Sequence, residues 1–425
     1  MMQSISRRKL LAGIGLAPWL MSSGIRAGVS RLRVVVIGGG FAGATAARYL
    51  KQQAPELDVV LIEPKSEFYT CPFSNHVLAG LQPLSSICHR YEGLIKQGVR
   101  HIRQSAQFID REKQRVWLED GQRLHYDRLL LATGISMNWQ AIEGYDQDAA
   151  QVLPHAWQAG AQTVLLRKQL QQMDAGGVVV ISVPDNPYRC PPGPYERASL
   201  IAHYLTQHKP RSKVLILDSK DTFSKQALFQ QGWKELYGER IEWLGRADGG
   251  QTWRVDALKR ELYTEFGQKH KGSVVNLIPP QTAAPIAQQA GLTDSTGWIP
   301  VRAASFQTQA DPAIYAAGDC TIASPMPKSA YSANAQAKVA VAAMLADLTG
   351  RGAPEPEWRN TCYSALRPNY AVSIAANYTV HQERLIEIPG SLALSPADGS
   401  QQLREQEFAL SQAWYSSICA DSWGV

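Results

Sequence analysis

Residues 176–205 read GGVVVISVPDNPYRCPPGPYERASLIAHYL, which begins like the first strand and turn of a nucleotide-binding unit. The apolar, β-branched run at 178–183 predicts a buried parallel strand, and residues 197–205 predict the helix that follows it. A glycine-rich turn normally joins such a strand and helix, because its backbone N–H groups hold a pyrophosphate. Prolines and a cysteine, Cys190, stand there instead. Proline has no N–H to donate, so this loop is not expected to hold a dinucleotide.

A complete dinucleotide fingerprint lies nearer the start of the chain. A buried strand at 33–37 runs into GGGFAG at 38–43, a helix follows at 44–53, and a second strand at 58–62 ends at Glu63. In this motif the three spaced glycines allow a tight turn, close approach of the pyrophosphate, and packing of the helix on the sheet. The phosphates lie at the helix N-terminus, and the later acid binds the ribose hydroxyls. The predicted cofactor-binding residues are Gly38, Gly40, Phe41, Ala42, Gly43 and Glu63.

Length and composition narrow the function classes. At roughly 100–200 residues per domain, the 425-residue chain has room for two or three domains. Its formal net charge of +6 is spread along the chain without a long basic run, so nucleic acid is not an expected partner. None of the six cysteines forms a CxxC or CxxCH pair, so no metal, iron–sulfur or self-attached haem site is expected in this chain.

Residues 1–27 predict a signal peptide that is not part of the fold. The pair Arg7-Arg8 precedes a short apolar segment at 10–21, and small residues follow near Ala27. The sequence resembles a twin-arginine export signal, with a plain secretory signal as the alternative. Either signal places the mature protein in the periplasm, where disulfides persist. No other stretch approaches the roughly 20 apolar residues of a transmembrane segment.

Two later strands resemble segments of the two-dinucleotide-domain flavoprotein reductases, the glutathione reductase-like group. One ends in Ala-Thr-Gly at 132–134, and the other ends in Gly-Asp at 318–319. The resemblance implies that the first site binds FAD, that Asp319 binds its ribityl chain, and that a helix at 327–343 directs its positive end at the flavin. It adds Lys328, at the start of that helix, to the predicted cofactor site. It also adds four residues from the two strand ends: Thr133, Gly134, Gly318 and Asp319.

The same resemblance implies an α/β fold with a particular domain order. An FAD-binding domain is split between 31–150 and 285–352, and a dinucleotide-like middle domain occupies 151–284. A C-terminal α/β interface domain occupies 353–425. In that group the middle domain binds NAD(P)H, and the proline-rich loop at 184–194 predicts that this chain lacks that site.

Over essentially the whole mature chain, the sequence resembles the flavoprotein subunit of flavocytochrome c sulfide dehydrogenase. Besides the nucleotide loop, the matching segments are YTCPFSN at 69–75, RCPPGPYER at 189–197, Gly-Asp at 318–319, NTCYS at 360–364 and Trp-Tyr at 414–415. The resemblance implies that Cys71 carries FAD covalently, as a thioether to the flavin 8α carbon. A buried thiol or a structural disulfide is the alternative role for Cys71.

The resemblance also implies a redox-active disulfide between Cys190 and Cys362 beside the flavin. Hydrosulfide would attack one sulfur and give a persulfide and a free thiolate, and the flavin would then take two electrons. Glu196 would move the proton, unless it serves only as an acid at a helix N-terminus. A purely structural disulfide is the alternative, and the cysteine facing the flavin stays open. The other three cysteines have no predicted role: Cys88, Cys320 and Cys419.

The electrons should leave through a partner, because this chain has no haem motif of its own. The resemblance implies a heterodimer with a small c-type cytochrome subunit that carries haem c. The alternatives are a sulfide:quinone oxidoreductase at the membrane surface, an NAD(P)H-dependent flavoprotein reductase, and a non-catalytic protein that keeps only the flavin fold. Residues 369–378 and 382–388 predict strands, and no basic amphipathic helix stands out after 353. Three aromatic residues belong either to the flavin shell or to the interface: Trp414, Tyr415 and Trp423.

Overall fold

The computed structural model describes residues 31–356 and 358–424. The predicted signal peptide at 1–27 lies outside the described residues. In the described part of the chain, no helix is long and apolar enough to cross a membrane. Residues 32–425 form one unit, and all the sheets below belong to it. The domain bounds expected inside that unit stay a prediction.

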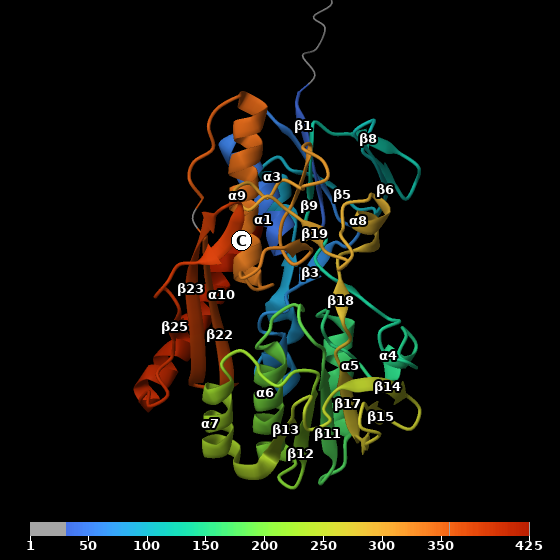
Figure 1. Ribbon diagram of the computed structural model, residues 1–425, viewed down its shortest axis with the longest axis vertical. Helices are drawn as coiled ribbons and strands as arrows, with labels where there is room; N and C mark the ends of the chain where they lie inside the picture. Colours follow the sequence, from blue (N-terminus) through green and yellow to red (C-terminus); the bar gives the residue numbers. More distant parts are fainter. Residues whose placement is uncertain (1–30, 357, 425) are drawn as a thin grey trace, which may run out of the picture. The chain divides into compact units, whose positions relative to one another are not determined.

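A five-stranded parallel sheet carries the predicted fingerprint (Figure 1). Its register pairs Ile37 with Leu131 and Leu131 with Ala316, so three neighbouring strands end at the same edge. The fingerprint loop, the Ala-Thr-Gly segment and the Gly-Asp segment therefore leave the sheet side by side, as ligand-binding loops of open α/β sheets do. In spatial order the strands are β20 (Ile314–Ala316), β9 (Arg128–Leu131), β1 (Arg33–Ile37), β2 (Asp58–Ile62) and β5 (Arg100–Ile102).

Two helices pack against each other beside this sheet, α1 (Phe41–Gln53) and α9 (Ala330–Thr349). Helix α9 begins three residues later than predicted, because Ser329 caps it by accepting a hydrogen bond from the Ser332 N–H. It also runs six residues beyond the predicted end and stops at Gly350, which adopts a left-handed conformation (φ 67°).

A second parallel sheet repeats the strand–loop–helix frame that the sequence predicted. Helix α6 begins at Gly193, earlier than expected. Pro194 is tolerated there because N–H groups in the first turn of a helix form no hydrogen bond within the helix, so a residue without an N–H costs nothing. The strands are, in spatial order, β13 (Ile241–Leu244), β12 (Lys213–Asp218), β11 (Val178–Val183) and β17 (Val274–Leu277). The helices of this region are α5 (Ala161–Gln172), α6 (Gly193–His208) and α7 (Gln226–Tyr237).

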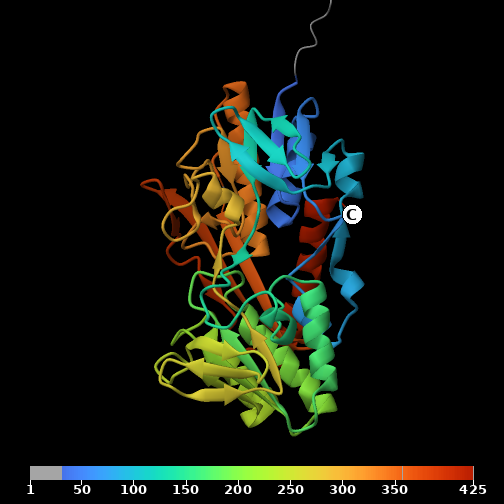
Figure 2. The ribbon, with the colours of Figure 1, turned by 90° about the vertical axis from the view of Figure 1, so that its right-hand side faces the viewer.

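The C-terminal part is an antiparallel sheet followed by a long helix, α10 (Gln401–Trp423). Helix α10 packs on the sheet and on α1, where Thr45 Oγ1 lies 3.0 Å from Ser422 Oγ. Figure 2 shows this red helix beside the blue start of the chain. The sheet contains β22 (Trp358–Arg367), β23 (Tyr370–His381), β24 (Arg384–Glu387) and β25 (Ala393–Leu394), which includes both predicted strands.

The remaining elements are short and connect these three regions. The short strands are β3 (Glu67–Tyr69), β4 (Cys88–Arg90), β6 (Ala106–Asp110), β7 (Arg115–Leu118), β8 (Arg123–His125), β10 (Ser136–Met137), β14 (Thr252–Asp256), β15 (Glu261–Thr264), β16 (Lys269–Lys271), β18 (Gln281–Thr282), β19 (Ile299–Pro300) and β21 (Thr321–Ile322). The short helices are α2 (Ser74–Ala79), α3 (Glu92–Lys96), α4 (Ala149–Val152), α8 (Pro285–Gln289), and the 3-10 turns η1 (Leu84–Ile87) and η2 (Gly238–Arg240).

Candidate active site

A cavity of about 1430 Å³, including its opening, takes wall residues from loops at the strand ends of both parallel sheets, from strand β22, and from helices that include α6, α9 and α10. Most of the predicted site residues therefore meet in one place, although they come from distant parts of the sequence. Only two of them, Gly43 and Lys328, are not part of the wall. The predicted residues that line the cavity are Gly38, Gly40, Phe41, Ala42, Glu63, Cys71, Thr133, Gly134, Cys190, Glu196, Gly318, Asp319 and Cys362.

The fingerprint loop has the geometry that a dinucleotide requires. Gly38 has a positive φ of 100°, and the Glu63 carboxylate accepts a hydrogen bond from the Gly39 N–H at 3.0 Å. Gly43 lies behind the loop, where a β-carbon would stand 1.8 Å from the Gly38 carbonyl oxygen. It therefore allows the helix to pack closely on the loop, which is the role of the third glycine. Helix α1 has no side-chain cap and no acid in its first turn, so its free N–H groups favour a phosphate.

Two buried oxygen atoms in the loops beside the fingerprint loop lack hydrogen-bond partners among the described residues. They are Asp319 Oδ1 and Thr133 Oγ1. Buried polar atoms in native proteins almost always have partners, so these two indicate a polar ligand. The hydroxyls of a ribityl chain would supply the missing groups, and the residues present therefore fit FAD.

Lys328 lies behind Asp319 and outside the cavity wall, which differs from its predicted contact with the cofactor. Its Nζ donates to the carbonyl oxygens of Asp319 at 2.9 Å and Thr321 at 2.7 Å. It also lies 3.6 Å from the centre of the Trp298 ring, and burial lowers its pKa to about 8. The Lys328 carbonyl accepts a hydrogen bond from the Cys190 N–H at 2.8 Å. Lys328 thus fixes the two loops that carry Asp319 and Cys190.

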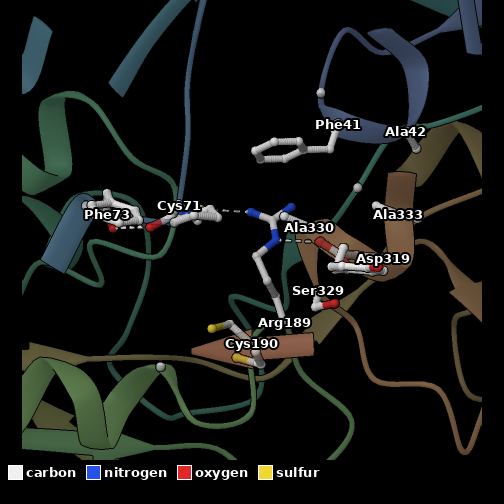
Figure 3. A pocket seen from close by; sticks show the side chains of 18 of the residues that line it. Phe41, Ala42, Cys71, Phe73, Arg189, Cys190, Asp319, Ser329, Ala330 and Ala333 are labelled. Atoms are coloured by element: carbon white, nitrogen blue, oxygen red, sulfur yellow. Dashed lines mark hydrogen bonds and ion pairs between the residues drawn. The ribbon is translucent and has the colours of Figure 1, made fainter. Parts of the chain in front are cut away.

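Cys71 faces the guanidinium of Arg189. Arg189 Nη1 lies 3.4 Å from Cys71 Sγ, and its Nε lies 2.6 Å from Asp319 Oδ2. Figure 3 shows the guanidinium between these two side chains. Burial favours a lower pKa for Arg189, but Cys71 and Asp319 outweigh burial and raise it, so the guanidinium stays charged. The Cys71 sulfur is therefore in contact with a fixed positive charge.

Cys190 and Cys362 line the same cavity, from the β11–α6 loop and from strand β22. Cys190 has φ 58°, a conformation uncommon for residues other than glycine. Burial raises the pKa of both thiols, and that of Cys190 is raised further by its neighbours Cys362 and Glu196. Each of the six cysteines is a free thiol in this structure, so the Cys190–Cys362 disulfide stays a prediction.

Glu196 lies in the first turn of α6, between the two cysteine-bearing segments. Its carboxylate accepts hydrogen bonds from the Ala365 N–H at 2.9 Å and from Asn75 Nδ2 at 2.8 Å. Burial raises its pKa, whereas these two hydrogen bonds and the nearby cations Lys225 and Arg197 act in the opposite direction. A carboxyl group with a raised pKa beside a thiol is suited to carry a proton.

Sequence reasoning missed a buried cation on the cavity wall, Arg197. Its guanidinium donates to Asn75 Oδ1 at 3.0 Å, to Asn276 Oδ1 at 2.9 Å, and to the carbonyls of His155 at 3.0 Å and Ala156 at 2.7 Å. All of these acceptors are neutral, and burial lowers the pKa of Arg197 to about 10. The signal was present, because Arg197 begins the mostly apolar stretch at 197–205 after a buried strand, where an arginine suggests a buried polar contact.

Helix α10 and the segment before Cys71 form the aromatic side of the site. Trp414 lines the cavity, and the Tyr415 hydroxyl lies 2.7 Å from Thr70 Oγ1. Trp423 is fully buried and stacks on Phe68 at 5.5 Å between ring centres. Of the two predicted roles for these aromatic residues, the structure favours the shell around the cavity.

Three family models match successive parts of the chain. Pyridine nucleotide-disulphide oxidoreductase matches residues 32–180. The central part of the sulfide dehydrogenase [flavocytochrome c] flavoprotein chain matches 163–279, and the flavin-binding part of flavocytochrome c sulphide dehydrogenase matches 354–423. The last two matches contain Cys190 and Cys362, respectively.

Individual relatives agree with these matches. The chain is 60% identical over 45 residues to the sulfide dehydrogenase [flavocytochrome c] flavoprotein chain of Chlorobaculum thiosulfatiphilum, which is 11% of this chain and 94% of that sequence. It is 23% identical over 312 residues to the mitochondrial sulfide:quinone oxidoreductase of Mus musculus, covering 72% of this chain and 69% of the relative. The solved sulfide:quinone oxidoreductase of Aquifex aeolicus superposes with a TM-score of 0.73 at 18% identity, over 93% of both chains. The predicted α/β flavoprotein reductase fold is confirmed.

Proposed function

Because this chain belongs to the family of flavocytochrome c sulfide dehydrogenase flavoprotein chains, we propose that it oxidises hydrosulfide at a Cys190–Cys362 pair and delivers the electrons to a c-type cytochrome. The family is one of FAD-dependent sulfide oxidoreductases. One observation carries the proposal. Both cysteines and Glu196 line the same cavity as the FAD-binding loops, so sulfur chemistry and the flavin would share one space.

FAD, when bound, would supply two-electron chemistry towards the sulfur and one-electron chemistry towards a haem on a partner. The fingerprint loop and Glu63 would hold its adenosine half, and Asp319 and Thr133 would hold its ribityl chain. We propose the covalent tether at Cys71, because it lines the same cavity as the fingerprint loop and its sulfur lies 3.4 Å from the Arg189 guanidinium.

Hydrosulfide would attack one sulfur of the Cys190–Cys362 disulfide. A new S–S bond forms, the old one breaks, and the products are a persulfide on one cysteine and a thiolate on the other. Glu196 would take the persulfide proton, since its pKa is raised by burial and its carboxylate, in the first turn of α6, reaches β22 at the Ala365 N–H. Nicotinamide is not part of the proposal, because the loop before α6 has prolines where backbone N–H donors would be needed.

The electron acceptor separates the two candidate functions. We propose export to the periplasm and a heterodimer with a c-type cytochrome subunit that carries haem c, as the family match suggests. The similarity to sulfide:quinone oxidoreductases favours membrane quinone as the second candidate.

The test is an anaerobic half-reaction on the purified protein with its flavin. Sulfide should bleach the visible flavin absorbance, NADH should not, and a Cys362→Ser variant should not respond to sulfide. The reduced protein is then offered cytochrome c or a soluble quinone. Bleaching by NADH alone would overturn the sulfide proposal, and reoxidation by quinone alone would replace the cytochrome with quinone.

A further inference from the structure

Lys225 is a buried cation placed directly behind Cys362. Its side chain is 6% exposed, and its Nζ donates to the Cys362 carbonyl at 3.2 Å and to Ser364 Oγ at 2.8 Å. Both acceptors are neutral. Across residues 31–356 and 358–424, no carboxylate forms an ion pair with Lys225. Its charge interacts at longer range with the buried Glu196 carboxylate, and a buried ammonium without a directly paired carboxylate also attracts any other negative charge that forms nearby.

Local rules disfavour a lysine at this position in three ways. The residue has φ 63°, which is uncommon for a side chain of this size. It is the N-cap of α7, where the helix dipole repels a cation. It is also desolvated by burial. A residue that breaks several local rules at once, beside a reactive group, indicates a functional rather than a structural purpose.

The two cysteines differ in their surroundings. Cys362 has Lys225 and Ser364 as its nearest polar neighbours, and both favour its anion against burial and Glu196. Burial and three neighbours, Cys362, Glu196 and Cys71, disfavour the Cys190 anion, and Lys225 acts in the opposite direction. Arg197 from α6 also interacts with Cys190. Arg197 thus favours an anion on Cys190, whereas Lys225 contacts the Cys362 carbonyl and Ser364 directly, so the Lys225 charge acts mainly on Cys362.

We propose that Lys225 is a positioning residue that makes Cys362 the leaving thiolate when hydrosulfide attacks the sulfur of Cys190. The inference rests on the proposed function and assigns the two cysteines their roles. An S–S bond forms between hydrosulfide and Cys190 Sγ, the Cys190–Cys362 bond breaks, and its electron pair stays on Cys362 Sγ. The sulfide sulfur is oxidised, the disulfide is reduced, and the persulfide proton passes to Glu196. The new charge lies beside the Lys225 ammonium.

Single-cysteine variants of the flavin-containing protein test this assignment. Cys190→Ser leaves the Cys362 thiol, and Cys362→Ser leaves the Cys190 thiol. The measurement is the rate of iodoacetamide alkylation at each cysteine against pH, resolved by peptide mass spectrometry. Cys362 should titrate at the lower pH. Adding Lys225→Met should raise the Cys362 midpoint by about one unit, which is about a tenfold slower alkylation near neutral pH, and should move Cys190 less. Lys225→Arg should restore the midpoint.

Lys220→Met is the matched control, because Lys220 is also buried in the same region but pairs with Asp218 at 2.6 Å. It should leave the Cys362 midpoint unchanged. If Lys225→Met disturbs folding, as judged by circular dichroism, Lys225→Gln takes its place. An unchanged Cys362 midpoint, or equal shifts at both cysteines, overturns the inference even when sulfide bleaches the wild-type flavin. Failure of sulfide to bleach that flavin overturns the proposed function instead, and the thiol titration does not depend on it.

Discussion

Replacing Glu196 with glutamine separates the two roles that its position allows, proton carrier and helix N-terminal acid. The side chain accepts hydrogen bonds from two donors, the Ala365 N–H at 2.9 Å and Asn75 Nδ2 at 2.8 Å. Glutamine has nearly the same shape but offers only one acceptor and cannot take up a proton. The substitution therefore removes the proposed proton transfer while it preserves most of the packing.

The structural cost follows from the two donors. The Ala365 N–H belongs to the backbone, and the Asn75 amide cannot turn over because its Oδ1 accepts from Arg197 Nε at 3.0 Å. One buried donor would thus face the glutamine amide, which costs about 1–3 kcal/mol. Removing a buried carboxylate whose pKa is raised offsets part of that cost. We expect the free energy of unfolding to fall by about 1–2 kcal/mol.

The effect on the reaction should be much larger than the effect on stability. A positioned acid or base typically contributes about 10²–10⁴-fold to a rate. We therefore expect sulfide to reduce the flavin of Glu196→Gln at least about 100-fold more slowly than that of the wild type. Anaerobic stopped-flow absorbance at saturating sulfide measures this rate, and urea unfolding measures the stability.

Glu407→Gln provides the matched control. Glu407 is a buried acid on α10 that accepts from Ser373 Oγ at 2.7 Å and from Arg404 Nη1 at 3.3 Å, away from the cavity wall. It should lose stability and keep the wild-type rate. If Glu196→Gln also keeps the rate within about threefold, the proton-transfer reasoning is wrong and Glu196 is a structural acid of α6.

Three further outcomes are expected. Cys71→Ser should release FAD into the supernatant after acid precipitation, whereas the wild-type pellet should keep it; equal release from both would refute the covalent tether. Gly43→Ala should abolish flavin binding, seen as lost visible absorbance, because the added β-carbon would lie 1.8 Å from the Gly38 carbonyl oxygen; a normally loaded variant would contradict the packing argument. Burial lowers the pKa of His76 and His155 from 6.5 to about 4, so the unfolded chain binds their protons more readily. Stability should be complete above pH 6.5 and fall as the pH drops towards 4, by about 2 kcal/mol per histidine at about pH 5, and urea unfolding that is flat over this range would refute it.

The parts of the site that could be predicted from the sequence are those encoded locally. The glycine spacing at 38–43 specifies a turn and a close helix contact, and the structure places Gly38 and Gly43 in those roles. The meeting of the cofactor loops could also be predicted, because the carboxyl ends of parallel strands lie at the same edge of a sheet. The register of Ile37 with Leu131 brings the first two cofactor loops together accordingly.

The parts that could not be predicted depend on contacts between distant segments. Lys225 shows no local pattern, because its role comes from strand β22 passing beside it. Trp414 reaches the cavity only because α10 folds back onto the first helix. The sequence predicts that Lys328 contacts the cofactor, because it lies near the expected start of a helix. The helix in fact begins at Ala330, and the lysine side chain turns back to two carbonyl groups.

The charges around the cavity explain how buried thiols can take part in thiolate chemistry. Burial alone raises the pKa of Cys190 and Cys362 and would keep both protonated. Lys225 opposes this effect at both cysteines, and Arg197 also interacts favourably with an anion on Cys190. A third cation, the half-buried Arg189, is paired with the Asp319 carboxylate. The hydrogen-bond acceptors of Arg197 and Lys225 are neutral, so their charges act on anions in the cavity, which include the Glu196 carboxylate as well as a thiolate. Strand β11, the loop after it and helix α6 thus have the strand–loop–helix frame of a dinucleotide site. In place of the backbone N–H donors that would bind a pyrophosphate, the loop carries a cysteine and lies beside buried cations. These groups suit an anion as small as hydrosulfide.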